Sequence, residues 1–191
     1  SGIYTVGPDQ QAATRMFGKF QSIQGNGLHW WWPSPIGQRD TVVVTATRQL
    51  ELGFRSEGQE MTKPVTYESM MITGDENLVD VQTVIQYKII DLRKYLFFVD
   101  DPGEQDRNVD PGSPDGVTLR DITETALRQV VGKRNIDDVL TTQKGEVQDE
   151  VLLLMRNLSQ NYDTGLEIIA VRLQNVNPPV HAQDAFDDVT R

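Results

Sequence analysis

LVDVQTVIQYKI, residues 78–89, is the stretch of sequence that decides the fold. Apolar and polar side chains alternate along it, and a period of two predicts a half-buried β-strand. The face predicted to be buried carries Val79, Val81, Thr83, Ile85, Tyr87 and Ile89. The opposite face carries Asp80, Gln82, Gln86 and Lys88. Such a strand is typical of an antiparallel sheet with one face on the core.

The residues before this strand predict further antiparallel strands. TGDEN (73–77) has the composition of a turn, and KPVTYESMMIT (63–73) is predicted to be the strand that leads into it. TVVVTATRQLELGF (41–54) opens with a run of valines and continues with alternation, which also indicates strand. Residues 1–90 are therefore predicted to be β-rich.

After residue 90 the apolar period changes to that of a helix. Asp91 is the predicted N-cap of a short helix over residues 91–100. Two longer amphipathic helices follow, each with an apolar stripe at helical spacing. The first stripe consists of Leu119, Ile122, Ala126 and Val130. The second stripe consists of Val147, Val151, Leu154, Leu158 and Tyr162.

The chain closes with a predicted strand and a predicted helix. GLEIIAVRLQNV (165–176) has the pattern of a strand, and PPVHAQDAFDDVTR (178–191) begins with prolines that the first turn of a helix tolerates. No breaker follows this helix, so it is expected to continue beyond Arg191. Its stripe consists of Ala182, Ala185, Phe186 and Val189.

These elements predict an α+β fold with antiparallel strands first. We expect a β-rich subdomain over residues 1–90 and an α/β subdomain over residues 91–177. Residues 178–191 are expected to begin a C-terminal helix. No run of about 18 apolar residues occurs, so no segment of the 191 residues is predicted to span a membrane by itself.

The charge balance argues against a nucleic-acid-binding protein. The chain has 18 basic and 28 acidic residues and a net charge of −10, whereas phosphate binding needs clustered cations. The charge is uneven: residues 1–50 carry four basic and two acidic groups, a net +2, so the remainder carries −12. This asymmetry suggests that the two ends face different surroundings, although a short segment can also differ by chance.

A search for catalytic chemistry finds no motif. The chain has no Cys, and His29 and His181 stand in no metal-ligand pattern, so we expect no metal, no cofactor and no enzyme activity. The acidic segment 99–116 lacks the spacing of a calcium loop and is predicted to be a solvated loop. A hydrolase that uses an unrecognised carboxylate site there is the alternative left open.

GLHWWWPSPIGQ (27–38) holds every tryptophan of the chain: Trp30, Trp31 and Trp32. Successive side chains of an extended segment point to opposite faces, so the middle ring should point away from its neighbours. Two interpretations remain open. One or two rings pack beneath a sheet, or the loop, with Pro33 and Ile36, is a membrane-interface site, because tryptophan favours the level of the lipid headgroups.

The chain resembles the SPFH (band 7) superfamily of stomatins, prohibitins, flotillins and HflK/HflC proteins. The resemblance lies in blocks that run in order along the sequence, and the second half is similar to the HflK branch. The segment 99–116 is longer, and the loop richer in tryptophan, than is usual for the family. The blocks are YTVGPDQQAATRMFGKF (4–20), GLHWWWPSP (27–35), DTVVVTATRQLELG (40–53), MITGDENLVDVQTVIQYKIIDLRKYLF (71–97), LRDITETALRQVVGKRNIDDVLTTQKGEVQDEV (119–151) and GLEIIAVRLQNVNPPVHAQDAFDDV (165–189).

The resemblance implies a non-enzymatic membrane scaffold. Family members carry a membrane anchor before this domain and a coiled-coil helix after it. HflK-like members assemble with HflC-like partners into rings or cages on the extracytoplasmic side of the bacterial plasma membrane, where they modulate the AAA protease FtsH. On this basis the stripe of residues 182–189 is expected to be an oligomer interface. A stomatin-like scaffold with another client, a channel or an NfeD-type partner, is the alternative.

Overall fold

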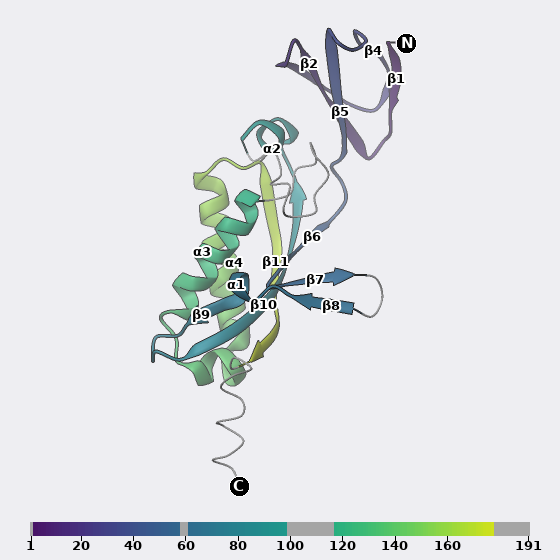
Figure 1. Ribbon diagram of the computed structural model, residues 1–191. Coiled ribbons are helices and arrows are strands. Elements are labelled where there is room, and N and C mark those ends of the chain that lie inside the picture. Colours follow the sequence, from purple (N-terminus) through teal and green to yellow (C-terminus); the bar gives the residue numbers. More distant parts are fainter. Residues whose placement is uncertain (1, 58–60, 99–116, 178–191) are drawn as a thin grey trace.

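The computed structural model describes residues 2–57, 61–98 and 117–177, which form two parts placed end to end (Figure 1). The first part is built from five strands among residues 3–43, and the second from the remaining strands and the helices. The predicted segments 99–116 and 178–191 lie outside the described residues. The α+β class predicted from the sequence is confirmed.

The first part consists of two small antiparallel sheets. β1 pairs with β4, and β2 stands between β3 and β5. Tyr4, Val6 and Ala12 are buried between the sheets, with Trp31 packed against them. This core is small because the strands are short. The strands are β1 (Ile3–Val6), β2 (Gln10–Met16), β3 (Lys19–Gln24), β4 (Gly27–Trp30) and β5 (Gly37–Val43).

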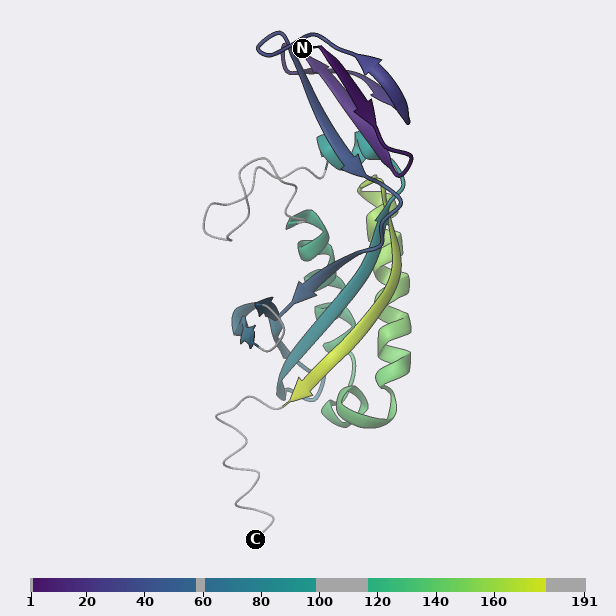
Figure 2. The same cartoon turned by 90° about the vertical axis from the view of Figure 1, so that its right-hand side faces the viewer.

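The second part is an antiparallel sheet covered on one face by two helices. β10 (Leu78–Ile89) is central, with β6 (Arg48–Leu52) on one side and β11 (Leu166–Asn177) and β9 (Met70–Ile72) also paired to it. The predicted buried face of residues 78–89 is confirmed, since all six of its side chains are buried. Figure 2 shows α3 (Val117–Val131) and α4 (Lys144–Asn161) along the same side of this sheet.

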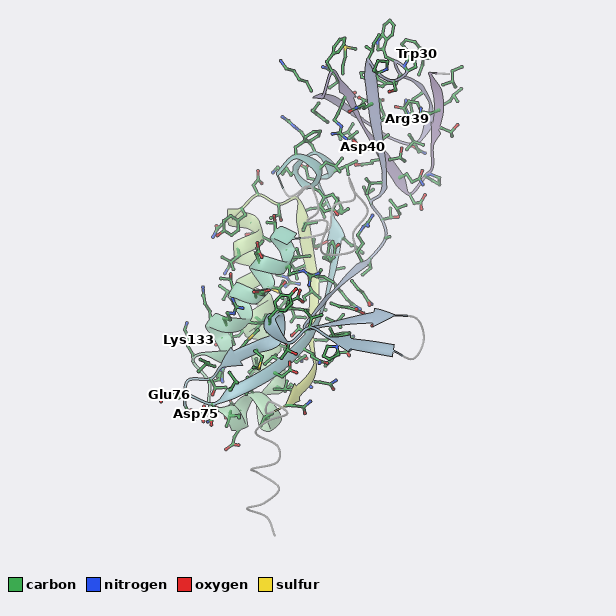
Figure 3. The ribbon with its side chains drawn as sticks, viewed as in Figure 1. Trp30, Arg39, Asp40, Asp75, Glu76 and Lys133 are labelled. Atoms are coloured by element: carbon green, nitrogen blue, oxygen red, sulfur yellow. The ribbon has the colours of Figure 1, made fainter. Side chains whose placement is uncertain are left out.

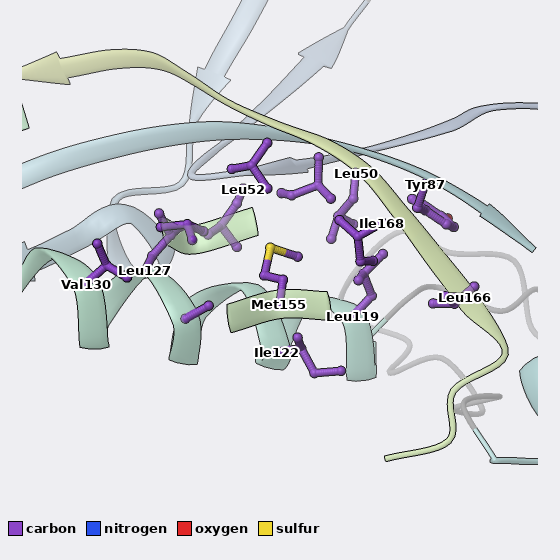
Figure 4. Packing of buried hydrophobic residues seen from close by; sticks show 14 of the residues in the cluster. Leu50, Leu52, Tyr87, Leu119, Ile122, Leu127, Val130, Met155, Leu166 and Ile168 are labelled. Atoms are coloured by element: carbon purple, nitrogen blue, oxygen red, sulfur yellow. The ribbon is translucent and has the colours of Figure 1, made fainter. Parts of the chain in front are cut away.

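The main core lies between these helices and the sheet (Figure 4). The stripe predicted for α3 is confirmed, because Leu119, Ile122, Ala126 and Val130 are all buried. For α4 the second half of the predicted stripe is wrong. Met155 and Ser159 continue the buried line begun by Val147 and Val151, whereas Tyr162 is exposed. The apolar residues Leu154 and Leu158 instead flank that line and are partly buried.

The strand predicted over residues 63–73 is interrupted. The structure has β8 (Met61–Pro64), one helical turn α1 (Thr66–Ser69) and then β9. A separate π-helical turn lies at Asp138–Thr142, between α3 and α4. The interruption at α1 has a tertiary cause: Glu68 is buried and accepts a hydrogen bond from the Gly53 N–H at 3.2 Å. Arg120 of α3 donates to the same Oε2 of Glu68 at 3.0 Å.

The strand predicted over residues 41–54 is likewise divided between separate sheets. β5 ends at Val43, β6 covers 48–52, and β7 (Phe54–Glu57) forms a hairpin with β8 that projects from the sheet (Figure 1). Gly53 makes the bend, with a φ of +82° that favours glycine. A side chain there would also meet the Ser69 Cβ at 2.4 Å.

β6, β9 and β10 share one sheet with β11, so strands from both sides of residue 90 belong together. On this pairing we propose that the two parts divide near residues 44–47. The short helix α2 (Leu92–Phe98) links them, and its predicted N-cap is confirmed by the Asp91 Oδ1 that accepts from the Lys94 N–H at 3.1 Å. Phe97 of α2 contacts Phe20 of β3, with ring centroids 5.2 Å apart.

Candidate functional site

The tryptophan loop begins where β4 ends, and its middle ring is the one that packs inward. Trp31 is half-buried against the small core, and its Nε1–H donates to the Arg15 carbonyl at 3.1 Å. The Trp31 backbone N–H donates to the Gly2 carbonyl at 2.7 Å, which extends the β1–β4 pairing by one residue. Trp31 is therefore a structural residue of the first part.

Trp30 and Trp32 point the other way, as the alternation of an extended chain requires. Their side chains are 57% and 45% exposed, and the two rings contact each other edge to face with centroids 5.1 Å apart. Figure 3 shows Trp30 at the outer end of the first part, far from the second part. The pair is held together but is open to the surroundings.

The loop that follows keeps further apolar side chains at the surface. Pro33 and Ile36 are exposed, and the Pro33 carbonyl accepts from the Gly37 N–H at 3.3 Å, which closes the loop. Gly37 is required because a Cβ there would lie 2.3 Å from the Trp32 carbonyl oxygen. The five residues that the sequence singled out, 30–33 and 36, therefore lie in one compact loop, with Trp31 turned inward.

Phe17 joins this surface and was missed by the sequence analysis. It stands at the tip of the β2–β3 hairpin, is 76% exposed, and donates its backbone N–H to the Ile36 carbonyl at 2.9 Å. Its φ is +49° and that of Gly18 is +79°, the two left-handed positions of a tight hairpin turn. Asn or Gly is preferred at the first of these positions, so a bulky Phe there costs stability. That unusual residue in MFGK is the signal that could have revealed the site.

The strand pairing adds two more residues. Ile3 is directly opposite Trp30 in the β1–β4 register, and Leu28 lies two residues before Trp30 on the same face. Six exposed apolar side chains thus stand on neighbouring segments of the first part, and we call this surface the apolar cap. It consists of Ile3, Phe17, Leu28, Trp30, Trp32 and Ile36.

Basic side chains stand beside the apolar cap. Lys19 is opposite Met16 next to the hairpin tip and is exposed. Arg15 forms an ion pair with Asp40 across β2 and β5. Arg39 lies with its guanidinium 4.7 Å from the centre of the Tyr4 ring. The pKa of Tyr4 is raised because burial disfavours the phenolate, an effect that the charge of Arg39 partly offsets.

The opposite end of the molecule holds the turn predicted at residues 73–77, which is confirmed. The Thr73 N–H donates to the Asn77 carbonyl at 2.9 Å, and the Asp75 carboxylate accepts from the Thr73 hydroxyl at 2.6 Å. The same carboxylate accepts from the Ile136 N–H at 3.1 Å. The hydrogen bond from Thr73, more than any other contact, lowers the pKa of Asp75. The turn therefore fastens the β9–β10 hairpin to the segment after α3.

Within residues 2–57, 61–98 and 117–177, no three or more His, Asp or Glu side chains are grouped as metal ligands. No helix in this described part is long and apolar enough to cross a membrane. His29 hydrogen-bonds the Gly25 carbonyl through Nε2 at 2.8 Å and lies against Tyr4. His181 and the predicted interface residues Ala182, Ala185, Phe186 and Val189 are outside the described residues.

Residues 4–191 match the SPFH domain / Band 7 family, so the chain belongs to this family. The resemblance found in the sequence is confirmed. Curated relatives carry the name HflK. Protein HflK of Treponema pallidum is 33% identical over 193 residues, which cover 99% of this chain and 55% of that protein. Protein HflK of Haemophilus influenzae is 31% identical over 191 residues, 100% of this chain and 40% of that protein.

A relative from Escherichia coli K12 is named modulator of FtsH protease HflK. It is 29% identical over 188 residues, which cover 98% of this chain and 38% of that protein. The chain thus spans between 38% and 55% of the length of these three relatives. The name of the relative places a protease modulator among the proteins to which this chain is similar.

Proposed function

We propose that this chain is the membrane-proximal SPFH region of an HflK-like scaffold that regulates an FtsH-type AAA protease and has no catalytic site of its own. The family match and the name of the E. coli relative support the regulatory role. We further propose an HflC-like partner, assembly into a ring or cage, and a place on the extracytoplasmic side of a bacterial plasma membrane.

The observation that carries the proposal is the arrangement of the apolar cap. Its six exposed side chains all come from the first part, while β11 of the second part runs away from the first part and finishes at Asn177 (Figure 1). This order suits a membrane scaffold that contacts lipid at one end and assembles at the other. The cap provides apolar rings with polar edges, which suit the headgroup layer.

The lipid contact follows from the chemistry of the exposed rings. Trp30 and Trp32 each have an indole N–H and an apolar body, and both rings remain about half exposed. We propose that these two rings, with Pro33 and Ile36, dip into the headgroup layer, and that Trp31 stays in the protein. Phe17 and Lys19 extend the same contact at the hairpin tip.

The regulatory role is tested with the full-length protein solubilised from its own membrane. A native pull-down followed by mass spectrometry is expected to recover an AAA protease and a second SPFH protein. Recovery of a channel or another membrane client without any AAA protease would contradict the proposal and favour a stomatin-like scaffold. Substitution of Phe186 and Val189 by Ser is expected to reduce the size of the assembly on native gels.

The lipid contact is tested separately with the 191-residue chain. We expect it to co-sediment with phosphatidylcholine vesicles, and the double variant Trp30→Ser/Trp32→Ser to lose most of this binding while its fold is retained. The matched control is Tyr67→Ser/Leu153→Ser, which removes two exposed apolar side chains of the second part. Equal binding by the cap variant and the wild type would contradict the lipid contact.

A further inference from the structure

A cavity of about 690 Å³ opens beside the apolar cap. It is lined by Gly2, Arg15, residues 31–34 and residues 37–40. The tryptophan loop forms one wall and β5, which pairs only with β2 among the described strands, forms the other. A volume of this size is within the range of about 300–1,000 Å³ that is usual for sites of small ligands.

The cavity carries a spare positive charge. Its lining includes the cations Arg15 and Arg39 and one anion, Asp40. Arg15 is paired with Asp40, whereas no carboxylate in the described part of the chain pairs with Arg39. The cavity therefore favours an anion, and Arg39 is the group that can contact it.

The contact that Arg39 does make leaves its hydrogen-bond donors available. The guanidinium lies over the Tyr4 ring at 4.7 Å from the centroid, so one face of the plane is used for a cation–π interaction. The five N–H groups of an arginine lie in the plane and not on its face. A guanidinium held by its face can still donate two parallel hydrogen bonds to a phosphate.

The position of the cavity indicates which phosphate it would meet. Trp32 belongs both to the cavity wall and to the apolar cap, so the cavity opens directly beside the surface proposed to enter the headgroup layer. Figure 3 shows that Arg39 and Asp40 lie farther from the outer end of the first part than Trp30 does. With Trp30 and Trp32 in the headgroup layer, the phosphate of a neighbouring lipid would lie farther from the acyl chains than the rings do, at the level of Arg39.

We propose that the cavity between the tryptophan loop and β5 binds the phosphate of an anionic phospholipid headgroup, with Arg39 as the anion contact and Trp32 on the acyl-chain side. This inference rests on the lipid contact of the proposed function and adds a preference for anionic lipid. Residues 1–44, with three basic and two acidic side chains, carry a net charge of +1 within a chain of −10, and this local excess attracts the same lipids.

The test compares vesicle binding of the wild-type 191-residue chain with that of a variant that lacks the Arg39 cation. The probes are vesicles of pure phosphatidylcholine and vesicles that contain 30% phosphatidylglycerol. Wild type is expected to bind the phosphatidylglycerol vesicles more tightly. The Arg39→Gln variant is expected to lose about fivefold of that affinity, the worth of one basic group near an anionic surface. It should lose less on pure phosphatidylcholine, because the choline cation of that lipid already offsets the charge of its phosphate.

The matched control is Arg172→Gln, which removes an exposed cation from β11 in the second part and should leave both affinities unchanged. If Arg39→Gln kept the wild-type preference for phosphatidylglycerol, the inference would be overturned. If Trp30→Ser/Trp32→Ser still abolished binding in that case, the proposed lipid contact would stand alone. Absence of wild-type binding to either vesicle would overturn both.

A soluble competitor separates lipid from free phosphate as the source of the anion. Inorganic phosphate at constant ionic strength is expected to displace the chain from vesicles only weakly, because it lacks the acyl chains that reach the apolar cap. If inorganic phosphate bound the chain with the same Arg39 dependence while the two vesicle types bound equally, the site would be one for free phosphate. That result would overturn the assignment to lipid.

Discussion

The two parts of this molecule use their apolar residues in opposite ways. In the second part, apolar side chains from the sheet and from α3 and α4 form one large core, with Met155 and Leu127 fully buried. In the first part, a separate small core holds only Tyr4, Val6 and Ala12, and six large apolar side chains are exposed, against seven among the described residues of the much longer second part. The second part is organised for stability and the first for contact with something apolar.

The two parts of the molecule also differ in their charge. The first part carries a small positive charge in a strongly acidic chain, and its cations stand beside the apolar cap. In the second part Arg120 and Glu68 are buried as a pair, and Glu68 also accepts from the N–H of Gly53, the residue just before the β7–β8 hairpin. A surface that combines exposed aromatic rings with spare cations suits a lipid headgroup layer. Four predictions test this comparison, from the largest effect to the smallest.

Removing the buried ion pair should have the largest effect, and on stability alone. In Glu68→Ala the Arg120 guanidinium stays buried without the carboxylate that accepts from it at 3.0 Å. A broken buried pair costs about 3–5 kcal/mol of the free energy of unfolding, measured by urea denaturation. Vesicle binding of the folded protein should not change. If the free energy of unfolding fell by less than about 1 kcal/mol, the ion pair would not be a major stabilising contact of this region.

The inward and outward tryptophans should separate stability from binding. Trp31→Ala removes a half-buried ring and its hydrogen bond to Arg15, and should cost about 2 kcal/mol, less than for a fully buried Trp. Trp32→Ala should change stability by less than about 0.5 kcal/mol and weaken vesicle binding several-fold. Thermal unfolding and co-sedimentation measure the two effects. If Trp32→Ala lowered the free energy of unfolding more than Trp31→Ala does, the distinction between an inward Trp31 and an outward Trp32 would be wrong.

Phe17→Asn should stabilise the fold and weaken lipid binding together. Asn tolerates the left-handed backbone found at φ +49°, so the free energy of unfolding should rise by about 0.5–1 kcal/mol. The exposed ring is lost at the same time, so vesicle binding should fall. Tyr162→Asn, at an exposed ring of the second part, is the control and should leave binding unchanged. Unaltered binding by Phe17→Asn would exclude the hairpin tip from the contact.

The Asp75 turn should show a small effect that depends on pH. Because the Asp75 pKa is lowered from its ordinary value of 3.8 in the folded state, its contribution is present at neutral pH. That contribution is lost as the pH falls from 3.8 through the lower folded value. Wild type should therefore be more stable than Asp75→Asn near pH 7, and the two should converge in strong acid. Glu76→Gln, in the same turn, is the matched control.

The sequence predicted the elements whose pattern is local. The strand over residues 78–89 has the bounds and the buried face that alternation indicated, and the stripe of α3 is buried as predicted. The N-cap at Asp91 depends only on the backbone N–H of Lys94, three residues later in the same segment. In each case the information lies within one element, so periodicity and capping are sufficient to find it.

The elements that were missed depend on distant partners. α1 interrupts a predicted strand because Glu68 is paired with Arg120. The two residues are 52 positions apart in the sequence, so a local pattern does not reveal this pair. On α4, Met155 and not Leu154 faces the sheet, which only the packing decides. In the candidate site the tryptophan loop was found from composition. Phe17 was not, because the hydrogen bond that brings the hairpin tip to Ile36 joins two segments.

The central claim is that Trp30 and Trp32 enter the lipid while Trp31 stays in the protein. The most direct measurement is fluorescence quenching by brominated phospholipids in three variants that each keep one tryptophan and replace the other two by Phe. The account predicts strong quenching of Trp30 and of Trp32 and little quenching of Trp31. Quenching of Trp31 as strong as that of its neighbours, or no quenching of any ring by vesicle-bound protein, would contradict it.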